Sequence, residues 1–490
     1  MWKLSIFSRD EIYQLHQTSL EILERTGIKL DHDRTLKLLD DLGATIDYKR
    51  KVAKIPENIV LEAVRNVQKS FVIRARNPKF NIEVGSGKLR CSMGTQLYII
   101  DPLNRSRRPG LTKDIIKGCI LGDALENITT VAPIVLPQDK PSEVREIASY
   151  HIGVKYTSKH LSVYFTQPAS IPYLIELASI VAGGLKKLIE GKSLSYLANP
   201  LTPLKYTRDT LTIVHYFAKL GLPIAFNSMP QAGITGPMTL AGSIVLGNAE
   251  VLAGITIAFL INKRLPVFYI NTPHITDMRY GSISFGSPEQ AILCVGAIQL
   301  AHFYGFPATV NAGLTDANTL DAQMGFEKAL TAVLAVLAGA ESIGAQGIVG
   351  ADQGACLEQL VLDNEFTSAI LRVKKGCDVS PEELALEAIN DVGIDGLFLT
   401  HRHTLTHARK VLWVPELFNR LDWNRWIKEG GKDLLIKARE KVEDILKKHN
   451  PELLDKDVEK ELDETAERAY KEILTKTRSP SKLDDLLDSV

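Results

Sequence analysis

The sequence is short of net charge, of cysteine and of long apolar runs, and each shortage excludes a class of protein. The 58 Lys and Arg residues balance the 58 Asp and Glu residues, so the formal net charge is zero. A chain without excess positive charge is not expected to bind nucleic acid or an anionic membrane as its main partner. The five cysteines are scattered without a CxxC pair. This usage fits a reducing cytoplasm better than a disulfide framework or a zinc ribbon.

The sequence also lacks an apolar signal core, since its N-terminal segment MWKLSIFSRDEIYQ becomes charged within a few residues. One stretch, Leu240–Ile261, is long enough to cross a bilayer. Asn248, Glu250 and several glycines interrupt it. We therefore expect a helix buried between a barrel, described below, and a neighbouring surface. Both observations favour a cytoplasmic protein.

Nucleotide-binding motifs are absent too. The glycine-rich run GLPIAFNSMPQAGITGP has neither the GxGxxG spacing of a dinucleotide fold nor the GxxxxGK of a phosphate loop. The HExxH pair of zinc proteases does not occur either. The sequence therefore offers no nucleotide site.

What the sequence does contain is a repeated alternation of short apolar runs and helical stretches. Eight units follow one another between about residues 129 and 409, and the expected strands are 130–136, 161–166, 194–198, 223–226, 266–270, 308–311, 342–345 and 396–400. Strands separated by helices must run parallel, because the crossover has to span a helix. Eight such units predict an α/β protein with a closed (β/α)8 TIM barrel.

The pattern divides the chain into three parts. Residues 1–112 resemble a mixed α+β cap, with helical spacing at 10–26, at 33–42 and after Pro56, and short strands between 71 and 100. Residues 113–425 hold the barrel. Residues 426–490 are strongly charged, and their apolar positions at helical spacing predict a C-terminal helical extension, by default a solvated tail or a subunit contact. The last dozen residues, from about Ser479, are expected to be disordered.

A barrel makes a prediction by position, because the residues that follow its strands should line one opening, which we call the mouth. These residues are mostly neutral amides, with few Lys or Arg: Pro137, Gln138, Asp139, Gln167, Asn199, Asn227, Met229, Asn271, His274, Asn311, Asp316, Gln346, His401 and His403. Such an opening suits a small polar or cationic substrate better than a phosphate, which requires Arg, Lys or a helix N-terminus.

The richest of these positions lies between Phe306 and Leu337, where a short strand turns through Gly313 into an apolar helix. Polar and acidic side chains crowd the turn: Asn311, Thr315, Asp316, Asn318, Asp321, Gln323 and Glu327. Asp316 and Asp321 are each equally well explained as helix N-caps. Capping alone does not account for so many hydrogen-bonding groups, so we place the chemistry at this turn.

Other polar groups have alternative interpretations. His401, His403 and His407 lie within seven residues of one another and suit a metal, which keeps a metal-dependent barrel hydrolase open as a function. Glu250 lies among apolar neighbours and must pair or hydrogen-bond, so it is either a structural anchor, which we favour, or part of the site. Three cysteines without an obvious histidine partner argue against a thiol nucleophile: Cys294, Cys356 and Cys377.

Several longer runs carry a family resemblance. They are AGITGPMTLAGSIVLGNAEVLAGI, YGSISFGSPE, TDANTLDAQMGFEKA and LFLTHRHTLTHARKVLWVPELF, with ERTGIKL and RSRRPGLTKD nearer the N-terminus. Together they resemble the trimethylamine methyltransferase family of corrinoid-dependent methyltransferases, over nearly the whole chain. The resemblance implies a TIM barrel whose mouth takes a methylated amine. It also implies a separate corrinoid protein whose cobalamin, as Co(I), accepts the methyl group, with no cobalamin tightly bound to this chain.

One departure from the family decides the expected substrate. In the trimethylamine enzymes the turn before the TD motif carries pyrrolysine, and the corresponding position here is Leu314. A leucine cannot form an adduct with an amine, so the chain resembles the non-pyrrolysine branch, which includes glycine betaine methyltransferases. A quaternary ammonium is already a cation with a neutral amine leaving group. Its direct demethylation by Co(I) needs positioning and exclusion of water rather than a general base.

The resemblance implies a site for a quaternary ammonium, which aromatic faces and carboxylates bind. The expected catalytic residues are Asp316, Asn311 and His403. The expected substrate-binding residues are Tyr98, His274, Arg279, Leu314, Gln323 and Glu327, with Phe165, Tyr269 and Phe285 as further aromatic candidates. Asp316 and Glu327 would supply the counter-charge, and Arg279 or His403 would bind the carboxylate of a betaine.

We expect no metal bound to the chain, and we expect a homo-oligomer that meets a cognate corrinoid protein. Besides the metal-dependent hydrolase, a barrel that binds an amine without turnover stays open as an alternative.

Overall fold

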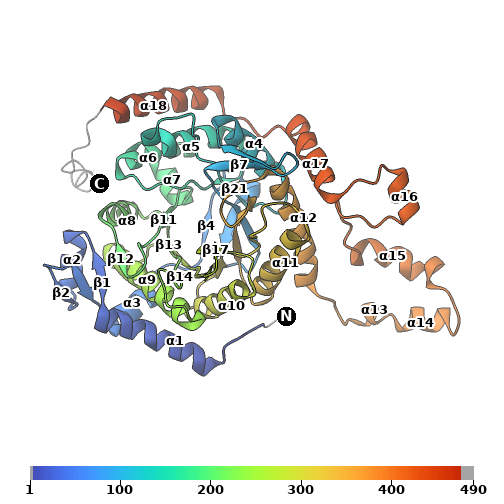
Figure 1. Ribbon diagram of the computed structural model, residues 1–490, viewed down its shortest axis with the longest axis horizontal. Helices are drawn as coiled ribbons and strands as arrows, with labels where there is room; N and C mark the ends of the chain where they lie inside the picture. The colour runs from blue at the N-terminus through green and yellow to red at the C-terminus, as the bar shows by residue number, and fades with distance from the viewer. Residues whose placement is uncertain (1–3, 476–490) are drawn as a thin grey trace.

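Eight parallel strands form one curled sheet at the centre of the computed structural model, which describes residues 4–475 (Figure 1). Their order in the sheet is β10 (His160–Leu161), β9 (Thr130–Val131), β6 (Arg90–Met93), β19 (Ser342–Gln346), β18 (Thr309–Val310), β15 (Val267–Asn271), β13 (Ile224–Ser228) and β11 (Tyr196–Ala198). Helices surround this sheet: α4 (Thr112–Ala124), α5 (Arg145–Gly153), α6 (Ile171–Ala182), α8 (Arg208–Leu220), α9 (Leu240–Ile261), α10 (Pro288–Phe303), α11 (Ala322–Leu337) and α12 (Leu357–Lys375).

The strands follow chain order around the ring, beginning at β6, and β19 returns to pair with β6. The predicted strand at 396–400 is therefore wrong, because Phe398–Thr400 forms a short 3-10 helix outside the sheet. The missing barrel strand is β6, which lies within the predicted cap and pairs with β9 and β19. A hairpin separates β6 from its helix α4, and that excursion hides the strand–helix alternation in the sequence.

The curled sheet has one seam. Among the described residues, β10 and β11 end the sheet and share no backbone ladder. Aromatic rings bridge the seam, since the ring of Phe165 stacks on those of Tyr196 and Phe217 with centroids 5.3 and 5.6 Å apart. Away from the seam, where β19 pairs with β6, α12 packs against both α11 and α4. The curled sheet with its outer helices fits a TIM-like barrel.

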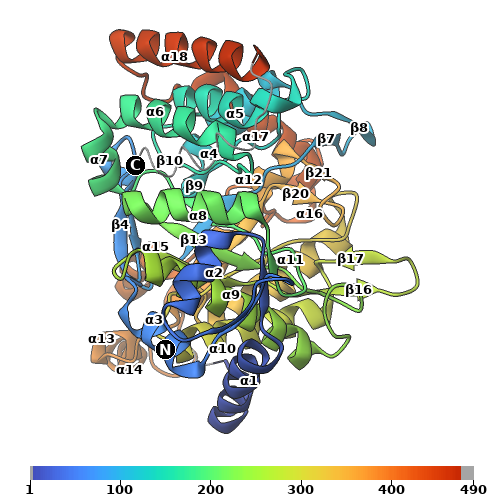
Figure 2. The ribbon, with the colours of Figure 1, turned by 90° about the vertical axis from the view of Figure 1, so that its left-hand side faces the viewer.

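Loops at the carboxyl ends of the strands build two small sheets beside the mouth (Figure 2). One joins β7 (Tyr98–Asp101) and β8 (Ser106–Pro109), which follow β6, to β20 (Ile348–Val349) and β21 (Gly354–Ala355), which follow β19. The other contains β14 (Gln231–Ala232), β16 (His274–Asp277) and β17 (Ser282–Ser284). Both sheets tie loops from different strands together.

The N-terminal segment covers α9. Its helices are α1 (Arg9–Glu21), which runs into a short π-helix (Ile22–Thr26), α2 (Asp33–Asp40) and α3 (Glu57–Asn66), and its strands are β1 (Ile28–Leu30), β2 (Thr45–Asp47), β3 (Val52–Lys54), β4 (Phe71–Ile73) and β5 (Ile82–Val84). Helices α1, α2 and α3 pack against α9, whose other side packs on β13 and β15. By length and composition α9 could cross a membrane, but it is buried on both sides. The prediction of a helix buried between the barrel and a neighbouring surface is confirmed.

The C-terminal helices pack on the barrel rather than standing in solvent. Helix α17 (Leu434–Lys448) lies against α12 and α4, and α18 (Lys456–Thr475) lies across α5 and α6 (Figure 2). The face of α18 that contains Leu462, Ala466 and Ala469 is fully buried. The expectation of a solvated tail is therefore wrong for these helices, because alanines allow close packing without large side chains. The alternative of a subunit contact stays a prediction. The predicted disorder from about Ser479 lies outside the described residues.

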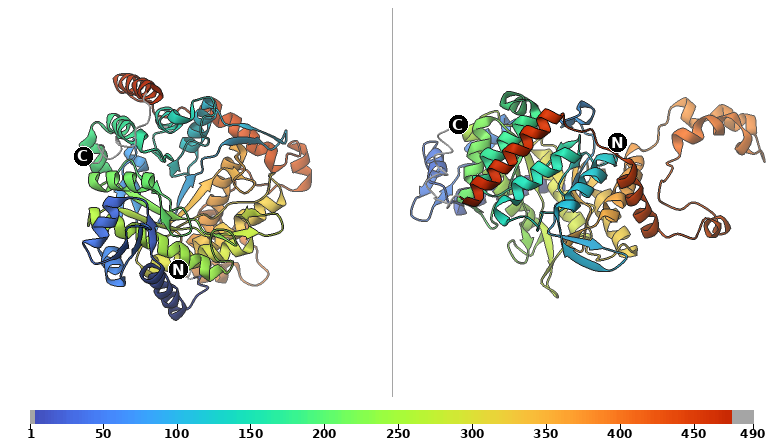
Figure 3. Two further views of the ribbon diagram at one scale, coloured as in Figure 1. Left: turned by 60° about the vertical axis from the view of Figure 1, so that its left-hand side comes forward. Right: turned by 90° about the horizontal axis from the view of Figure 1, so that it is seen from above.

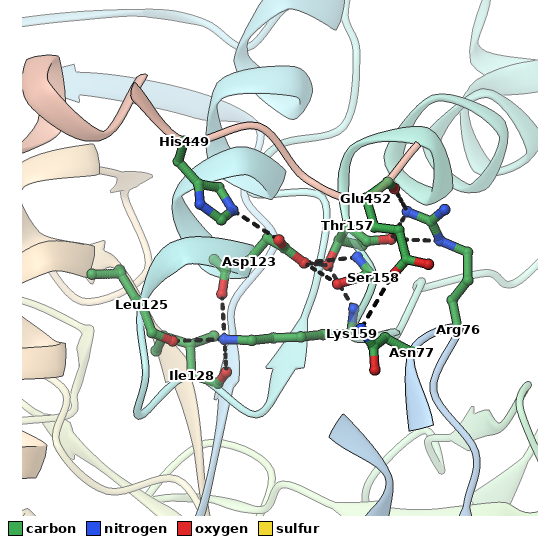
Figure 4. Close-up of polar contacts among 11 residues, drawn as sticks. Arg76, Asn77, Asp123, Leu125, Ile128, Thr157, Ser158, Lys159, His449 and Glu452 are labelled. Carbon is green, nitrogen blue, oxygen red and sulfur yellow. Dashed lines mark hydrogen bonds and ion pairs between the residues drawn. The ribbon is translucent and has the colours of Figure 1, made fainter. Parts of the chain in front are cut away.

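A polar network fastens this tail to the barrel face opposite the mouth (Figure 4). Lys159 Nζ donates hydrogen bonds to the carbonyl oxygens of Gly122, Leu125 and Ile128 at 3.0, 2.6 and 2.7 Å. The neighbouring Asp123 carboxylate lies 2.8 Å from Nε2 of His449, which follows α17. Buried charges need such partners, so this cluster fixes both the start of β10 and the position of the tail.

Between α12 and α17 the chain leaves the barrel. We call residues 377–410 the arm. It contains α13 (Pro381–Leu384), α14 (Leu386–Val392) and most of α15 (Arg402–Val411), and it projects away from the barrel (Figures 1 and 3). The short helix α16 (Trp423–Lys428) lies on the return path to α17. The arm therefore takes no part in the sheet or its helical layer.

Candidate active site

The carboxyl ends of β15 and β18 bring two predicted residues together at the mouth. Nδ2 of Asn311, which follows β18, lies 3.5 Å from Nε2 of His274, which follows β15. A Cβ added at Gly344 would lie 3.3 Å from Oδ1 of Asn311, so the amide fills the space above a barrel glycine. Adjacent parallel strands place these two side chains side by side, as the position rule predicts.

The hydrogen bonds of His274 define its protonation state. Its Nδ1 lies 3.0 Å from Oε1 of Gln290, which is an acceptor, so Nδ1 carries the proton and Nε2 accepts from Asn311. Burial lowers the pKa of His274 to about 4. The edge of the Phe285 ring packs on the imidazole with centroids 4.6 Å apart. The imidazole is therefore a neutral, oriented group at neutral pH.

The two acidic residues of the turn hold backbone in place. Asp316 accepts from the Ser284 hydroxyl and, at 2.6 Å, from the Phe285 backbone N–H, which ties the turn to β17. Glu327 accepts from the Thr315 hydroxyl at 2.6 Å and from the Asp316 backbone N–H at 2.8 Å. Asp316, Phe285, His274 and Asn311 thus form one continuous line of contacts. Capping belongs to Asp321, which is the N-cap of α11.

A buried ion pair supports the same turn from below. Lys328 Nζ donates to the Gly313 carbonyl at 2.7 Å and lies 2.9 Å from Asp363 Oδ1. The other Asp363 oxygen accepts from the Gly347 backbone N–H at 2.7 Å. Lys328 is only 2% exposed. Two charges in α11 and α12 thereby link the loop after β18 to the loop after β19.

Neutral amides line the neighbouring strand ends, as predicted. Asn227 Nδ2 donates to Asn199 Oδ1 at 2.9 Å, and the Thr272 hydroxyl donates to Asn227 Oδ1 at the same distance. Glu250 is fully buried in α9 and accepts from the Thr202 hydroxyl and the Leu204 backbone N–H. The expected structural role of Glu250 is confirmed by these contacts.

The histidine cluster does not lie at the mouth. His401, His403 and His407 belong to the arm, where His401 caps α15 and the rings of His403 and His407 stack with centroids 4.0 Å apart. The assignment of His403 to the catalytic site is therefore wrong, because it depended on a barrel strand at 396–400. Within residues 4–475, no group of three or more His, Cys, Asp or Glu residues is arranged to hold a metal. The alternative of a metal-dependent hydrolase was based on this histidine cluster, which does not lie at the mouth.

The other residues predicted to bind the substrate lie in different surroundings, some buried and some exposed. Leu314 is 1% exposed within the turn, and Gln323 is exposed on α11, where it donates to Glu327 at 2.8 Å. Arg279 has a side chain that is 78% exposed, and it pairs with Asp277 at 2.6 Å on the turn between β16 and β17. Tyr98 lies on β7, 4.6 Å from the Arg107 guanidinium.

Two of the aromatic candidates are core residues. The Phe165 ring belongs to the seam described above, and the Tyr269 hydroxyl donates to Asn248 of α9 at 2.8 Å. Burial raises the pKa of Cys91 and of Cys294 to about 12, and the Cys294 thiol donates to the Asn311 backbone carbonyl at 3.3 Å. A thiolate nucleophile is not available there at neutral pH.

A cavity of about 180 Å³ lies at the opposite face, between α5, α6 and the start of β10. Its lining includes Arg74, Arg76, Lys159 and Lys187 and no carboxylate. A positive lining repels a cationic substrate. The turn after β18, with its carboxylates, is therefore the better candidate for a cation.

Sequence reasoning missed the helix residues that support the turn. Gln290 contacts His274 from α10, Lys328 contacts the turn from α11, and Asp363 pairs with Lys328 from α12. None of them follows a strand. A signal was present for Lys328, which is the last charged residue before the apolar run ALTAVLAVL. A lone charge beside such a run needs a buried partner.

A family model and curated relatives agree on one family. A family model described as trimethylamine methyltransferase (MTTB) matches residues 1–473. The trimethylamine methyltransferase MttB of Desulfitobacterium hafniense is 32% identical, over 92% of this chain and 91% of its own length. The glycine betaine methyltransferase of another strain of that species is 31% identical, over 96% and 98%. The crystal structure of Methanosarcina barkeri monomethylamine methyltransferase (MtmB) matches 98% of this chain and 88% of its own with a TM-score of 0.49 and 13% identity.

The buried ion pair generates a stability prediction. Lys328→Met leaves Asp363 as an uncompensated buried charge and should lower the free energy of unfolding by about 3–5 kcal/mol. Lys88→Met is the matched control, because Lys88 also lies 2.9 Å from a carboxylate, that of Glu83, but is exposed. It should cost no more than about 1 kcal/mol. Equal losses in denaturant unfolding would contradict the role of the buried pair.

The neutral state of His274 is testable directly. In an NMR titration of protein with labelled histidine, the His274 ring should remain neutral through pH 6.5, where an ordinary histidine is half protonated, and should protonate only near pH 4. The folded state disfavours its protonation, so folded stability falls as the pH drops from 6.5 towards 4. The His274→Asn variant assigns the signal. A midpoint near 6.5 would show that the ring is neither buried nor fixed.

Proposed function

The chain belongs to the trimethylamine methyltransferase family and is a methyltransferase, and we propose that it moves a methyl group from a small quaternary amine of the glycine betaine kind to a corrinoid. The methyl acceptor is Co(I) of a separate corrinoid protein, which is a second substrate here. The observation that carries the choice of amine is Leu314, an apolar residue at the centre of the polar turn, 1% exposed.

The chemistry follows from the charge of the donor. As the methyl carbon bonds to cobalt, the C–N bond breaks and the nitrogen keeps the electron pair, so a neutral tertiary amine leaves and Co(I) becomes Co(III). No proton moves in this step. A site that positions the amine and excludes water is sufficient. The neutral His274–Asn311 pair, which lacks a charged acid–base partner, is compatible with that requirement.

The charges around the turn favour a cation. Asp316 and Glu327 contribute two carboxylates, whereas the positive charge of Lys328 is offset by Asp363 at 2.9 Å. Because His274 stays neutral, it adds no opposing positive charge. Carboxylates close to a substrate cation in a water-poor site attract it more strongly than they would in bulk water. In this proposal Asp316 and Glu327 provide the counter-charge, with the Phe285 ring nearby.

Leu314 separates quaternary from tertiary amines. A free tertiary amine would have to leave as an amide anion, which is a poor leaving group, so it needs protonation or covalent activation before methyl transfer. A leucine side chain supplies neither a proton nor a covalent adduct. A quaternary ammonium needs no such activation. An apolar side chain beside its methyl groups also makes favourable contacts and keeps water away. Leu314 therefore serves as a packing surface for the N-methyl groups in this proposal.

The carboxylate of a betaine requires donors other than those expected from the sequence. Arg279 is paired with Asp277 in solvent, and His403 lies in the arm. The Asn311 amide and the neighbouring amides Asn227 and Asn199 remain as neutral donors at the mouth. Neutral donors bind a carboxylate without cancelling the negative field that attracts the ammonium group. We assign this role to Asn311 first, because it contacts His274.

The proposal has two structural corollaries. The sheet acts as a closed barrel, with the Phe165–Tyr196 stack replacing hydrogen bonds at the seam. The corrinoid protein approaches the mouth between the two small sheets, since the methyl group must meet cobalt there. We also place the enzyme in the cytoplasm, in line with its scattered cysteines.

The decisive experiment mixes the purified chain with reduced cobalamin, free or on a corrinoid protein, and a panel of amines. Glycine betaine, choline, tetramethylammonium and trimethylamine form the panel, and methylcobalamin is read from the absorption spectrum. Turnover of a quaternary member supports the proposal. Turnover of trimethylamine alone would refute the role of Leu314. Binding of an amine by calorimetry without methyl transfer would identify a non-catalytic amine-binding barrel.

Removal of one counter-charge gives a sharper prediction. Asp316→Asn should lower kcat/KM for the active quaternary amine about tenfold or more, which corresponds to about 1.4 kcal/mol of lost transition-state stabilisation. The matched control is Asp321→Asn on the same turn, because asparagine remains a good N-cap for α11. That control should keep kcat/KM within about twofold. Equal losses in both variants would show that Asp316 acts only through the fold.

A further inference from the structure

The arm exposes apolar side chains that nothing in its own chain covers. Among residues 377–410 the exposed large hydrophobic residues are Val379, Leu384, Leu386, Ile389, Ile394, Leu397, Phe398, Leu399 and Leu405. Ile394 is 97% exposed and Leu399 71% exposed. Soluble monomers rarely expose contiguous apolar patches beyond a few hundred Å². An apolar surface of this extent marks an interaction site.

The arm also lacks anchoring to the barrel. The polar side-chain contacts described for residues 377–410 stay within the arm, such as those from His407 to Glu382 at 3.3 Å and from His401 to Asp391 at 3.8 Å. Its helices are short, and fewer than a dozen residues of helix are marginal in water without packing. Figure 3 shows the arm standing clear of the barrel in the view from above. A covering partner would supply the missing packing.

Charge is divided along the arm. The first part carries six acidic residues and no Lys or Arg: Asp378, Glu382, Glu383, Glu387, Asp391 and Asp395. The second part carries only basic groups, namely Arg402, Arg409 and Lys410 besides the three histidines. A surface with separate acidic and basic halves is complementary to itself when a two-fold axis places each half against the opposite half.

We propose that the arm is an interface between two copies of this chain. The arms of the two copies lie side by side about a two-fold axis, with the acidic half of one against the basic half of the other and the apolar side chains between them. A stable interface uses about 20–30 residues on each side, and permanent dimers bury about 2,000 Å² or more. Residues 377–410 are long enough to supply that number of residues.

The arm lies on a different face of the barrel from the mouth, so the partner that covers the arm is distinct from the corrinoid protein. Helix α12 begins after the mouth loops and ends at Lys375, and Lys374 Nζ donates to the Gly87 carbonyl before β6, so the arm leaves from the face opposite the mouth. Figure 2 shows α13 and α14 on the left and the mouth sheets on the right. Given the proposed function, a protein that presents cobalt at the mouth would not cover the arm. A second copy has no such constraint.

Exchanging the charges tests the two-fold arrangement. Variant A carries Glu383→Lys and Glu387→Lys, and variant B carries Arg409→Glu and Lys410→Glu; all four side chains are exposed. Each variant alone places like charges against each other and should sediment as a 54.1 kDa monomer, whereas the native chain should show at least twice that mass. An equimolar mixture of A and B restores opposite charges at both contacts and should recover the native mass with one copy of each.

Substitution of two exposed apolar residues tests the apolar part of the interface. Ile394→Asp with Leu399→Asp should weaken assembly at least tenfold in sedimentation equilibrium, while Leu42→Asp, which alters a 53% exposed leucine of the N-terminal segment, should not. Because these side chains are exposed, the melting temperatures of all variants measured as monomers should agree. A monomeric native chain, charge variants that keep the native mass, or a mixture that stays monomeric would overturn the proposal. Arm variants that lose only binding to a corrinoid protein would overturn it as well. Sedimentation measures the mass of the assembly and does not depend on methyl transfer. A failure of the proposed interface can therefore be distinguished from a failure of the proposed function.

Discussion

The parallel alignment of the strands is the constraint on which the rest of the structure depends. Parallel strands send all their carboxyl ends to one face, so groups distant in the sequence meet there without any local motif. His274 and Asn311 meet because β15 and β18 are neighbours. The loops after β18 and β19 meet for the same reason, and Lys328 and Asp363 then fasten them to each other.

Carboxylates beside uncharged polar side chains make the mouth suitable for a cation. Lys328 and Asp363 are structural charges that cancel, and their hydrogen bonds to Gly313 and Gly347 position backbone. Asp316 and Glu327 remain as a local excess of negative charge beside an uncharged imidazole. The opposite face has the reverse character, with basic side chains around its cavity. A cation is therefore expected at the mouth rather than in that cavity.

The sequence predicted β13, β15 and β19 nearly at their observed positions. It failed at β6 and at residues 396–400, where burial and apolar character disagree. The sequence did not predict β6, because this strand begins with the charged residue Arg90 and because the β7–β8 hairpin separates it from the helix that follows. The run GLFLT at 396–400 looks like a core strand but is exposed in the arm. At the site, the position rule located His274, Asn311 and Asp316. Gln290 contacts His274 from α10 and Asp363 pairs with Lys328 from α12, and neither carries a local signal.

The place of β6 has a consequence for how the protein is made. Because β6 is synthesised long before β19, the first barrel strand emerges from the ribosome with one of its two neighbours missing until most of the chain has been translated. Non-local strand pairing of this kind is slow, and unpaired edges promote aggregation. The nascent N-terminal segment would thus depend on chaperones for longer than a barrel whose first strand closes early. Truncation before residue 342 would leave β6 with an open edge, so partial fragments of this chain are expected to be poorly soluble.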